Sequence, residues 1–467
     1  MGDETGWNET LDRASSWSRR WLASLGDRPV GVPVDAAEMR ARLDDRLPAQ
    51  GPPPAQVLDE LAAALEPGLV ASGGPRYFGF VTGGALPVAL GADWMVSAAD
   101  QDAATFVMSP AAAVVEEIAG RWVLDLLGLP DGAAVGFVTG AQMASVACVA
   151  AARRALVGAQ GWDVERDGLA GAPVPTVVVG EHAHATMIQA LRLLGFGSAR
   201  AVRVPVDVHG RMRADRLREV LATIPGPVLV CAQAGQVNTG ASDPFDEIAD
   251  LVDAREHAWL HVDGAFGLWA AAAPTRRHLV AGVERADSWA VDAHKWLNVP
   301  YDAAMAIVRD RGALTEAMTT SAAYLPFGEL DPAARTPENS RRARAVPIYA
   351  ALRTLGRDGV ADLVERCCVL ARQASEELAR HPRVEVLDDV VLNQVLFRPD
   401  GLDVADLAAA VQRDGTCWIG TTAWQGRPAL RFSVSNWSTT AADVTRATTR
   451  ITDLVDALSS PASPGAP

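Results

Sequence analysis

The stretch AVDAHKWLNVP, residues 290–300, runs from an apolar segment directly into a histidine and a lysine. Apolar residues continue beyond Lys295, beginning with Trp296 and Leu297. Lysine is rarely buried, because its ammonium group loses hydration when it leaves water. The ordinary interpretation is a lysine whose side chain reaches the rim of the protein. The alternative is a buried amine with a lowered pKa, which is a nucleophile able to form a Schiff base.

The sequence around this stretch alternates between short apolar segments and amphipathic segments. The apolar segments predict strands at 175–180, 199–206, 227–234, 258–265 and 287–293. The amphipathic segments between them predict helices at 184–195, 214–224 and 243–256. This alternation is typical of βαβ units around a largely parallel, buried sheet. In such α/β sheets the ligand lies beyond the carboxyl ends of the strands, and Lys295 follows one of these ends.

The alternating region is expected to belong to a large α/β domain over residues 73–342. The preceding segment, 1–72, carries too little apolar sequence to fold alone and predicts a helical arm on a partner surface. Residues 343–458 begin with two long helical patterns and predict a smaller α+β domain. The strands of this smaller domain are expected near 383–387, 391–397 and 429–435. Residues 459–467 are rich in proline and serine and are expected to form a disordered tail.

Composition narrows the functional class. The 467 residues are 49% hydrophobic and 21% charged, as in a globular protein, and carry a formal net charge of −15. This charge argues against nucleic acid or an anionic membrane as a partner, because both require clustered lysine and arginine. The five cysteines lack metal-binding spacing, so no metal site is expected. No run of apolar residues is long enough to span a membrane. The sequence therefore predicts a cytoplasmic enzyme with reduced thiols.

Polar residues follow several of the expected strands. Asp263 closes an apolar strand and is either a capping carboxylate or a group that keeps a heteroaromatic nitrogen protonated. His184 opens a helix, where it either caps the first turn or stacks on a flat ligand. Gly140 and Ala141 begin another helix whose free amides would bind phosphate, although this signal is weak by itself. His294 is either a phosphate donor or a packed core histidine.

Together with Lys295, these features predict a planar cofactor with a pyridine ring and a phosphate, namely pyridoxal 5′-phosphate (PLP). The residues that carry them resemble the fold-type I PLP enzymes and, among these, the group II amino acid decarboxylases, which are similar to aromatic-amino-acid and glutamate decarboxylases. The resemblance spans residues 70–455 and is strongest in HAHATMIQALRLLG, NTGASDPFDEIADL, WLHVDGAFG and DSWAVDAHKWLNVP, in that order. It implies a PLP-dependent carboxy-lyase with a large, mainly parallel α/β sheet of seven strands.

The resemblance also implies roles for individual residues. Lys295 corresponds to the Schiff-base lysine, Asp263 to the partner of the pyridinium nitrogen, and His184 to the residue that stacks on the ring. The other implied cofactor contacts are Ala265 beneath the ring, Gly140, Ala141, Gln142 and His294 around the phosphate, and Thr239 along the active site. The implied substrate contacts are Phe80, Val81 and Thr82, and also Arg431, which would clamp the substrate carboxylate unless it is a framework residue. A homodimer is implied as well, with the arm on the partner and the active site near the interface.

Two departures from the family pattern affect the expected reaction. The family's mobile loop carries a tyrosine that protonates the substrate's α-carbon after CO₂ leaves, whereas residues 326–342 contain no tyrosine and Tyr324 lies at their edge. Gln142 and Met143 replace the more usual small hydroxyl and acidic residues of the phosphate segment. The leading hypothesis is decarboxylation through a quinonoid intermediate, alone or coupled to oxidative deamination that gives an aldehyde. The alternatives are β-elimination including C–S cleavage, an aldol-type reaction, transamination, or a non-catalytic binding protein on the same fold.

Overall fold

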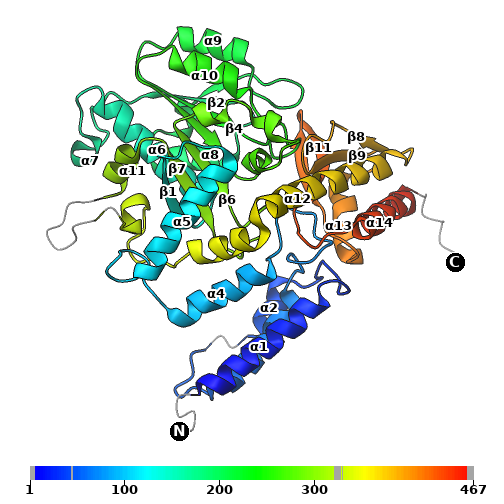
Figure 1. Cartoon of the computed structure of the whole chain (residues 1–467). Helices are drawn as coiled ribbons and strands as arrows, with labels where there is room; N and C mark the ends of the chain where they lie inside the picture. Colours follow the sequence, from blue (N-terminus) through cyan, green and yellow to red (C-terminus); the bar gives the residue numbers. More distant parts are fainter. Residues whose placement is uncertain (1–5, 44–45, 320–327, 329, 460–467) are drawn as a thin grey trace, which may run out of the picture.

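A large central sheet organises the molecule (Figure 1). The computed structural model describes residues 6–43, 46–319, 328 and 330–459. The strands of this sheet are β1 (Ala134–Val138), β2 (Thr176–Gly180), β3 (Val202–Val204), β4 (Val228–Gln233), β5 (Ala258–Asp263), β6 (Ser288–Asp292) and β7 (Ala304–Val308). They are hydrogen-bonded in the order β1-β7-β6-β5-β4-β2-β3, with β7 antiparallel to both neighbours and the remaining pairs parallel. The expected large, mainly parallel sheet of seven strands is confirmed.

The strands expected from the alternating pattern are all present, each somewhat shorter than its apolar segment. The pattern does not predict β7, because β7 follows β6 without an intervening helix. The connection between these two strands, residues 293–303, carries Lys295. It begins at the carboxyl end of β6 and returns antiparallel, so Lys295 lies at the sheet edge where the parallel strands end.

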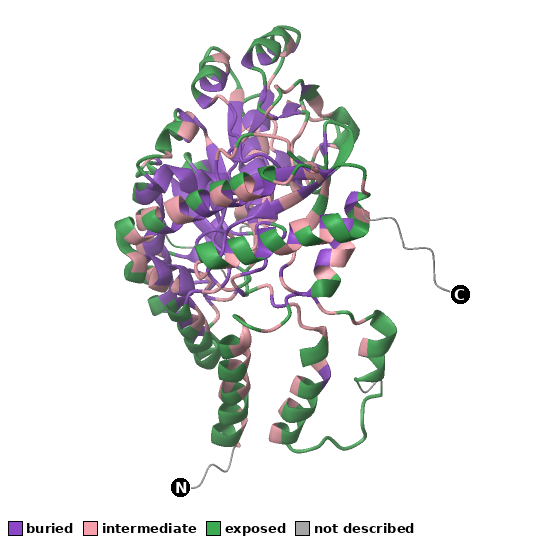
Figure 2. Ribbon diagram, turned by 90° about the vertical axis from the view of Figure 1, so that its right-hand side faces the viewer, coloured by how far each residue is buried: buried purple, intermediate pink, exposed green. Residues whose placement is uncertain are grey.

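Helices cover both faces of the sheet, and alternate strand residues face opposite layers. Val177 and Val179 pack in one cluster with α6 (Ala141–Gly158), α8 (Ala185–Leu193) and α11 (Arg311–Met318). Val178 packs in a second cluster on the other face. The helices that contribute to that cluster include α5 (Pro110–Leu127), α9 (Ala214–Ala222), α10 (Phe245–Asp253) and α12 (Ala345–Ala379). Burial on both faces explains the nearly continuous apolar strands, and Figure 2 shows this buried centre in purple.

The C-terminal part forms a second, antiparallel sheet in the order β10-β11-β9-β8. Its elements are β8 (Val384–Val386), β9 (Gln394–Pro399), α13 (Val404–Asp414), β10 (Gly420–Trp424), β11 (Arg427–Ser433) and α14 (Ala441–Ser459). The smaller α+β unit matches the expectation, except that α13 and β10 were not expected. The two helical patterns expected from residue 343 onward form one element, α12, which is interrupted at Gly356 with φ 61°. Ser459 belongs to α14 rather than to a tail, and residues 460–467 lie outside the described residues.

The N-terminal arm consists of α1 (Trp7–Ser24), α2 (Ala36–Ala41) and α3 (Pro54–Leu65). None of the residues of α1 is buried, and Figures 1 and 2 show the arm standing away from the body. Between the arm and the sheet lies α4 (Pro87–Ala99), which packs on α12. The remaining helical segments are α7 (Val164–Asp167) and the 3₁₀ turns Glu66–Gly68, Ser198–Arg200, Gly267–Ala272, Arg277–Val280, Val283–Arg285 and Pro332–Arg335. Every helix among the described residues is too short or too polar to cross a lipid bilayer.

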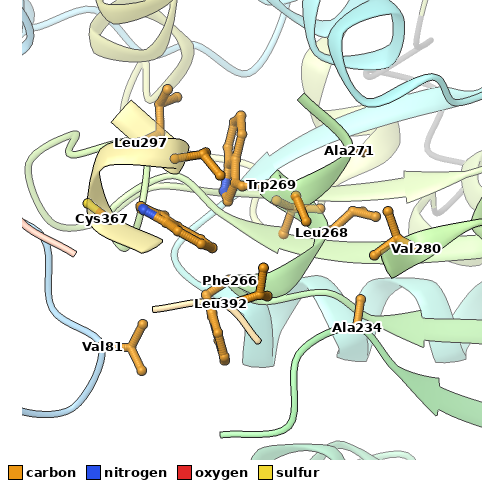
Figure 3. Packing of buried hydrophobic residues seen from close by; sticks show 14 of the residues in the cluster. Val81, Ala234, Phe266, Leu268, Trp269, Ala271, Val280, Leu297, Cys367 and Leu392 are labelled. Atoms are coloured by element: carbon orange, nitrogen blue, oxygen red, sulfur yellow. The ribbon is translucent and has the colours of Figure 1, made fainter. Parts of the chain in front are cut away.

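The segments that follow β5 and β6 rest on an apolar core, which Figure 3 shows. Phe266 and Trp269 follow β5, Leu297 follows Lys295, and they pack together with Cys367 of α12. Trp269 also donates its indole N–H to the carbonyl oxygen of Asp292 at 2.8 Å. A densely packed base of this kind fixes the position of the polar residues at the strand ends.

Candidate active site

A cavity of about 210 Å³ lies at the carboxyl ends of the parallel strands. It is lined by Gly140, Ala141, Gln142, His184, Thr186, Gln233, Gly235, Val237, Asp263, Ala265, Phe266, Asp292, His294 and Lys295. Eight of the predicted cofactor contacts are in this set, although they come from segments far apart in the sequence. The alternating fold brings them together because each follows a strand that ends at the same edge of the sheet.

Lys295 faces this cavity, with its side chain 24% exposed. Its Nζ atom lies 2.9 Å from Oδ2 of Asp292. The segment 79–84 presses against the lysine from outside, because a Cβ added to Gly83 would collide with the carbonyl oxygen of Lys295. The amine is therefore partly buried and paired with a carboxylate.

Asp292 is the charged residue among the six cavity residues that sequence reasoning missed. It is 2% exposed, and Oδ1 accepts the N–H of Ala141 at 2.6 Å while Oδ2 pairs with Lys295. A signal was available, because Asp292 closes an apolar strand in the same way as Asp263. One carboxylate thus connects the start of α6 with the lysine.

Asp263 ends β5 and is 8% exposed. Its Oδ1 accepts the N–H of Ala265 at 3.2 Å, and no basic side chain among the described residues forms an ion pair with it. A buried carboxylate is costly unless a cation accompanies it. The protonated nitrogen of a PLP ring would supply this cation, so Asp263 fits the expected cofactor.

His184 is both the cap of a helix and a wall of the cavity. Its Nδ1 accepts the N–H of Thr186 at 3.3 Å and lies 2.7 Å from the Thr186 hydroxyl. Burial lowers the pKa of His184, against the opposite effect of Asp263. The two interpretations of this histidine are therefore compatible, and its ring is neutral with its proton on Nε2.

The N-terminus of α6 forms the other end of the cavity. Gly140 precedes the helix and has no side chain with which to cap it, and Asp292 accepts the N–H of Ala141 from the neighbouring strand β6. A Cβ on Gly140 would lie 3.5 Å from Cε1 of His294 and 3.8 Å from Oδ1 of Asp292. Glycine thus leaves open the space between a helix N-terminus and an imidazole, which is a suitable place for a phosphate.

Five predicted site residues lie outside the lining of this cavity. Thr239 is buried and both functions of its hydroxyl are used, since it donates to the His209 carbonyl at 2.8 Å and accepts the N–H of Ala241 at 3.2 Å. The four predicted substrate contacts also lie outside, namely Phe80, Val81, Thr82 and Arg431.

The segment of Phe80 and Val81 has an unusual backbone. Their φ angles are 52° and 57°, although neither residue is glycine and Val81 is β-branched. Such conformations cost energy and often mark functional sites. Phe80 is 64% exposed, whereas Val81 is buried and lies near Phe266 and Leu392 in Figure 3. Phe80 is therefore presented to the outside, three residues before Gly83, which abuts Lys295.

Arg431 of β11 lies behind the cavity wall. Its Nη1 donates to the carbonyl of Val237 at 2.9 Å, and Val237 lines the cavity. Burial lowers the pKa of Arg431 to about 10. No carboxylate among the described residues forms an ion pair with this guanidinium.

The loop expected to lack a catalytic tyrosine is only partly described. Tyr324 and residues 326, 327 and 329 lie outside the described residues. From residue 330 onward the chain is well packed: Pro332–Arg335 form a buried 3₁₀ turn, and Asp331 accepts the N–H of Phe106 at 2.7 Å. The second half of this segment is thus a structured part of the large domain.

Comparisons with known proteins agree with this geometry. A family described as "Pyridoxal-dependent decarboxylase conserved domain" matches residues 37–400. The chain is 26% identical over 455 residues to an aromatic-L-amino-acid decarboxylase of Bacillus atrophaeus, covering 93% of this chain and 92% of the relative. It is 30% identical over 420 residues to an L-2,4-diaminobutyrate decarboxylase of Rhizobium meliloti, with 85% and 82% covered. A crystal structure of Oryza sativa TDC with PLP and tryptamine superposes with a TM-score of 0.90 at 25% identity, covering 98% and 99% of the chains.

The fold, together with the match of the decarboxylase family to residues 37–400, defines a PLP-dependent lyase of fold type I. The chain belongs to the family of pyridoxal-dependent decarboxylases. Its cofactor is PLP, and its reaction is that of an amino acid decarboxylase.

Proposed function

We propose that this enzyme removes the carboxylate of an α-amino acid with an aromatic side chain. The observation that carries the proposal is the cavity in which Lys295, Asp263 and His184 meet at the strand ends. PLP, when bound, accepts the electron pair that the departing carboxylate leaves behind. The amine of Lys295 would bond to the cofactor, Asp263 would hold the proton of the ring nitrogen, and His184 and Ala265 would enclose the ring.

The phosphate would lie at the start of α6. Its proposed contacts are the main chain of Gly140, Ala141 and Gln142, and the Nε2–H of His294. Thr239 would act indirectly, since its hydroxyl ties the segment 237–240 to the carbonyl of His209. No metal is part of this proposal, and no group of three or more metal-binding side chains is present among the described residues.

The aromatic preference rests on the segment next to Lys295. The rings of Phe80 and Trp418 lie 5.2 Å apart, and Trp418 stacks on Tyr77 at 4.9 Å. Such surfaces favour a flat apolar side chain. Arg431 would bind the substrate carboxylate, while Val81 and Thr82 would shape the wall. Relatives named as aromatic-amino-acid and tryptophan decarboxylases support this substrate class.

The PLP-loaded enzyme tests the proposal when it is mixed with single amino acids and CO₂ is measured. We expect kcat/KM for tryptophan, tyrosine or phenylalanine to exceed that for glutamate and 2,4-diaminobutyrate by about a hundredfold. Phe80→Ala should raise KM for the aromatic substrate, and Arg431→Met should raise it more than Arg431→Lys. A higher kcat/KM for a diamino or acidic substrate would contradict the aromatic preference. Release of pyruvate without CO₂ would favour β-elimination instead.

An aldehyde product is a second candidate, because residues 326–342 contain no tyrosine that could protonate the substrate carbon. In that case one O₂ and one water are consumed for each amino acid, and the products are an aldehyde, CO₂, ammonia and hydrogen peroxide. An oxygen electrode distinguishes the two outcomes. Consumption of O₂ in proportion to CO₂ supports the aldehyde, whereas amine formation without O₂ consumption excludes it.

We further propose a homodimer whose arms wrap the partner and whose active sites lie near the interface. The arm exposes apolar residues, including Leu11 and Leu22, on a helix without buried residues. The face beside the site exposes Phe80 and Met95, which are 64% and 70% exposed. Large exposed apolar surfaces mark association sites. Light scattering should give twice the chain mass, and a monomer with full activity would contradict the proposal.

A cytoplasmic location is also proposed. All five cysteines are buried and free, which suits a reducing compartment. The acidic net charge of −15 gives no reason to expect nucleic acid or membrane partners. Fractionation of the producing cells tests the location, and recovery in a secreted or membrane fraction would contradict it.

A further inference from the structure

We propose that Asp292 competes with the phosphate of PLP for the start of α6 and thereby lowers the affinity of the enzyme for its cofactor. The inference rests on the proposed phosphate site and goes beyond it, because it concerns how tightly that site retains PLP. Asp292 would act as a positioning residue for Lys295 and, at the same time, as a rival anion.

The competition follows from the two contacts of the carboxylate. Oδ1 accepts the N–H of Ala141 at 2.6 Å, and this amide belongs to the helix N-terminus at which the phosphate is expected. Oδ2 lies 2.9 Å from Nζ of Lys295. A phosphate at this helix end therefore meets a carboxylate that already holds the first amide.

Asp292 cannot easily move aside, because its main chain is fixed on both sides. Its N–H donates to the carbonyl of Ala265 at 3.0 Å, and its carbonyl accepts the indole N–H of Trp269 at 2.8 Å. Its side chain is only 3% exposed, so water does little to screen the charge. The carboxylate can therefore leave the cradle only by rotation of its own side chain and not by a shift of the main chain.

Few positive charges offset the two anions. Lys295 is the only lysine or arginine in the lining of the cavity among the described residues. Burial lowers the pKa of His294, so this ring contributes an N–H but no charge. The dipole of α6 supplies a partial positive charge of about one half. Like charges at such short range cost several kcal/mol, so Asp292 opposes a dianionic phosphate.

The consequence concerns cofactor loading. An enzyme with this carboxylate releases PLP more readily than one with a neutral side chain at the same position. The active fraction of the protein therefore follows the concentration of free PLP. Asp292 would thereby make activity responsive to cofactor supply.

Binding of pyridoxamine 5′-phosphate and of pyridoxamine to the cofactor-free protein tests the proposal. Neither compound can bond covalently to Lys295, and only the first carries a phosphate, so the pair isolates the phosphate contact. We expect Asp292→Asn to bind pyridoxamine 5′-phosphate at least about tenfold more tightly than wild type, a gain of about 1.4 kcal/mol. Pyridoxamine binding should change less than about twofold, since only a phosphate meets the charge of Asp292.

Asp287→Asn is the matched control. Asp287 lies at the opposite end of β6, where its Oδ2 accepts the N–H of Leu260 at 2.8 Å, and it does not line the cavity. We expect this variant to bind both compounds as wild type does. Asp292→Ser removes the charge with a smaller side chain and should tighten phosphate binding in the same direction, which guards against a folding defect of one variant.

Unchanged or weaker binding of pyridoxamine 5′-phosphate by both Asp292 variants would overturn the proposal, because it would mean that the carboxylate supports the site. Equal tightening of pyridoxamine and pyridoxamine 5′-phosphate would also overturn it, since the effect would not depend on the phosphate. A wild-type protein that binds neither PLP nor pyridoxamine 5′-phosphate would contradict the proposed cofactor site itself, which is a separate outcome.

Discussion

Nδ1 of His294 accepts the main-chain N–H of Ala303 at 3.2 Å. This contact leaves the proton of the neutral ring on Nε2, which lies 3.4 Å from Oδ1 of Asp292. The ring of Tyr301 stacks on the imidazole with centroids 4.3 Å apart and holds it in place. His294 is therefore oriented as a donor toward the start of α6, and its role as a phosphate contact stays a prediction.

Replacing His294 by phenylalanine should weaken the binding of PLP by about tenfold or more, because a hydrogen bond to a charged group contributes about 1.5–3 kcal/mol. Affinity for pyridoxal, which lacks the phosphate, should change much less. His294→Gln retains an N–H donor and should lie between wild type and His294→Phe. Fluorescence titration of the cofactor-free variants measures these affinities, and an equal loss for PLP and pyridoxal would contradict the role.

Gly140→Ala should reduce PLP affinity without unfolding the protein. The added Cβ meets its neighbours at 3.5 and 3.8 Å, which are ordinary contacts, and the φ of Gly140 is −174°, which any residue adopts. The methyl group would instead occupy space between the helix N-terminus and His294. We expect weaker binding of PLP, unchanged binding of pyridoxal and an unchanged melting temperature. A lowered melting temperature would point to a structural role for this glycine.

Much of this site could be predicted from the sequence, because strand ends and chemistry coincide there. Lys295, Asp263 and His184 each follow an apolar segment, and parallel strands bring their carboxyl ends to one edge. Local patterns therefore sufficed to assemble a cavity from distant segments. The cofactor follows from this assembly and does not depend on any single motif.

Other features depend on tertiary contacts that local patterns do not show. Asp292 closes an apolar strand, which is a local signal, but its contacts with the N–H of Ala141 and the amine of Lys295 form only in the folded chain. Thr239 was expected along the active site, but its hydroxyl is already used by the carbonyl of His209. The strand β7 has no helix before it, so the alternation that predicts β2 to β6 gives no indication of it, and β1 was not among the expected strands either.

His261 should make the protein sensitive to acid. It is fully buried, Trp259 donates its indole N–H to the Ser288 hydroxyl, and this hydroxyl lies 2.9 Å from Nδ1 of His261. Burial lowers the pKa of His261 to about 3. In the unfolded chain the pKa of a histidine is about 6.5, so between these values only the unfolded chain binds the proton. Stability is therefore retained above pH 6.5 and falls as the pH decreases below it.

We expect the free energy of unfolding to lose about 1.4 kcal/mol per pH unit through His261 below pH 6.5. His261→Gln removes this titration. Below pH 6.5 the free energy of unfolding of this variant should therefore fall less steeply with pH than that of wild type, by about 1.4 kcal/mol per pH unit. The substitution lowers stability at neutral pH. His278 is exposed, so His278→Gln serves as the control that shows the effect of removing a histidine that is not buried. Urea unfolding between pH 7.5 and 4.5 measures the slopes, and identical slopes for wild type and His261→Gln would refute this assignment.

Arg341 should be among the most important residues for stability. Its Nη1 lies 2.6 Å from Oε1 of Glu116, with the two side chains 0% and 1% exposed, and the guanidinium also donates to the carbonyls of Ala103 and Phe137. It thereby ties the segment after residue 330 to α5 and β1. Arg341→Met leaves the charge of Glu116 buried and unpaired, which should cost about 3–5 kcal/mol.

The double variant Arg341→Met, Glu116→Leu separates the loss of the pair from the cost of an unpaired charge. Removing both charges should restore a large part of the lost stability, because a buried ion pair contributes little beyond an apolar pair of similar volume. The positive coupling between the two substitutions should amount to about 1–3 kcal/mol in urea unfolding. Additive losses would show that the hydrogen bonds from Arg341 to the main-chain carbonyls stabilise the fold, and that the ion pair with Glu116 contributes nothing further.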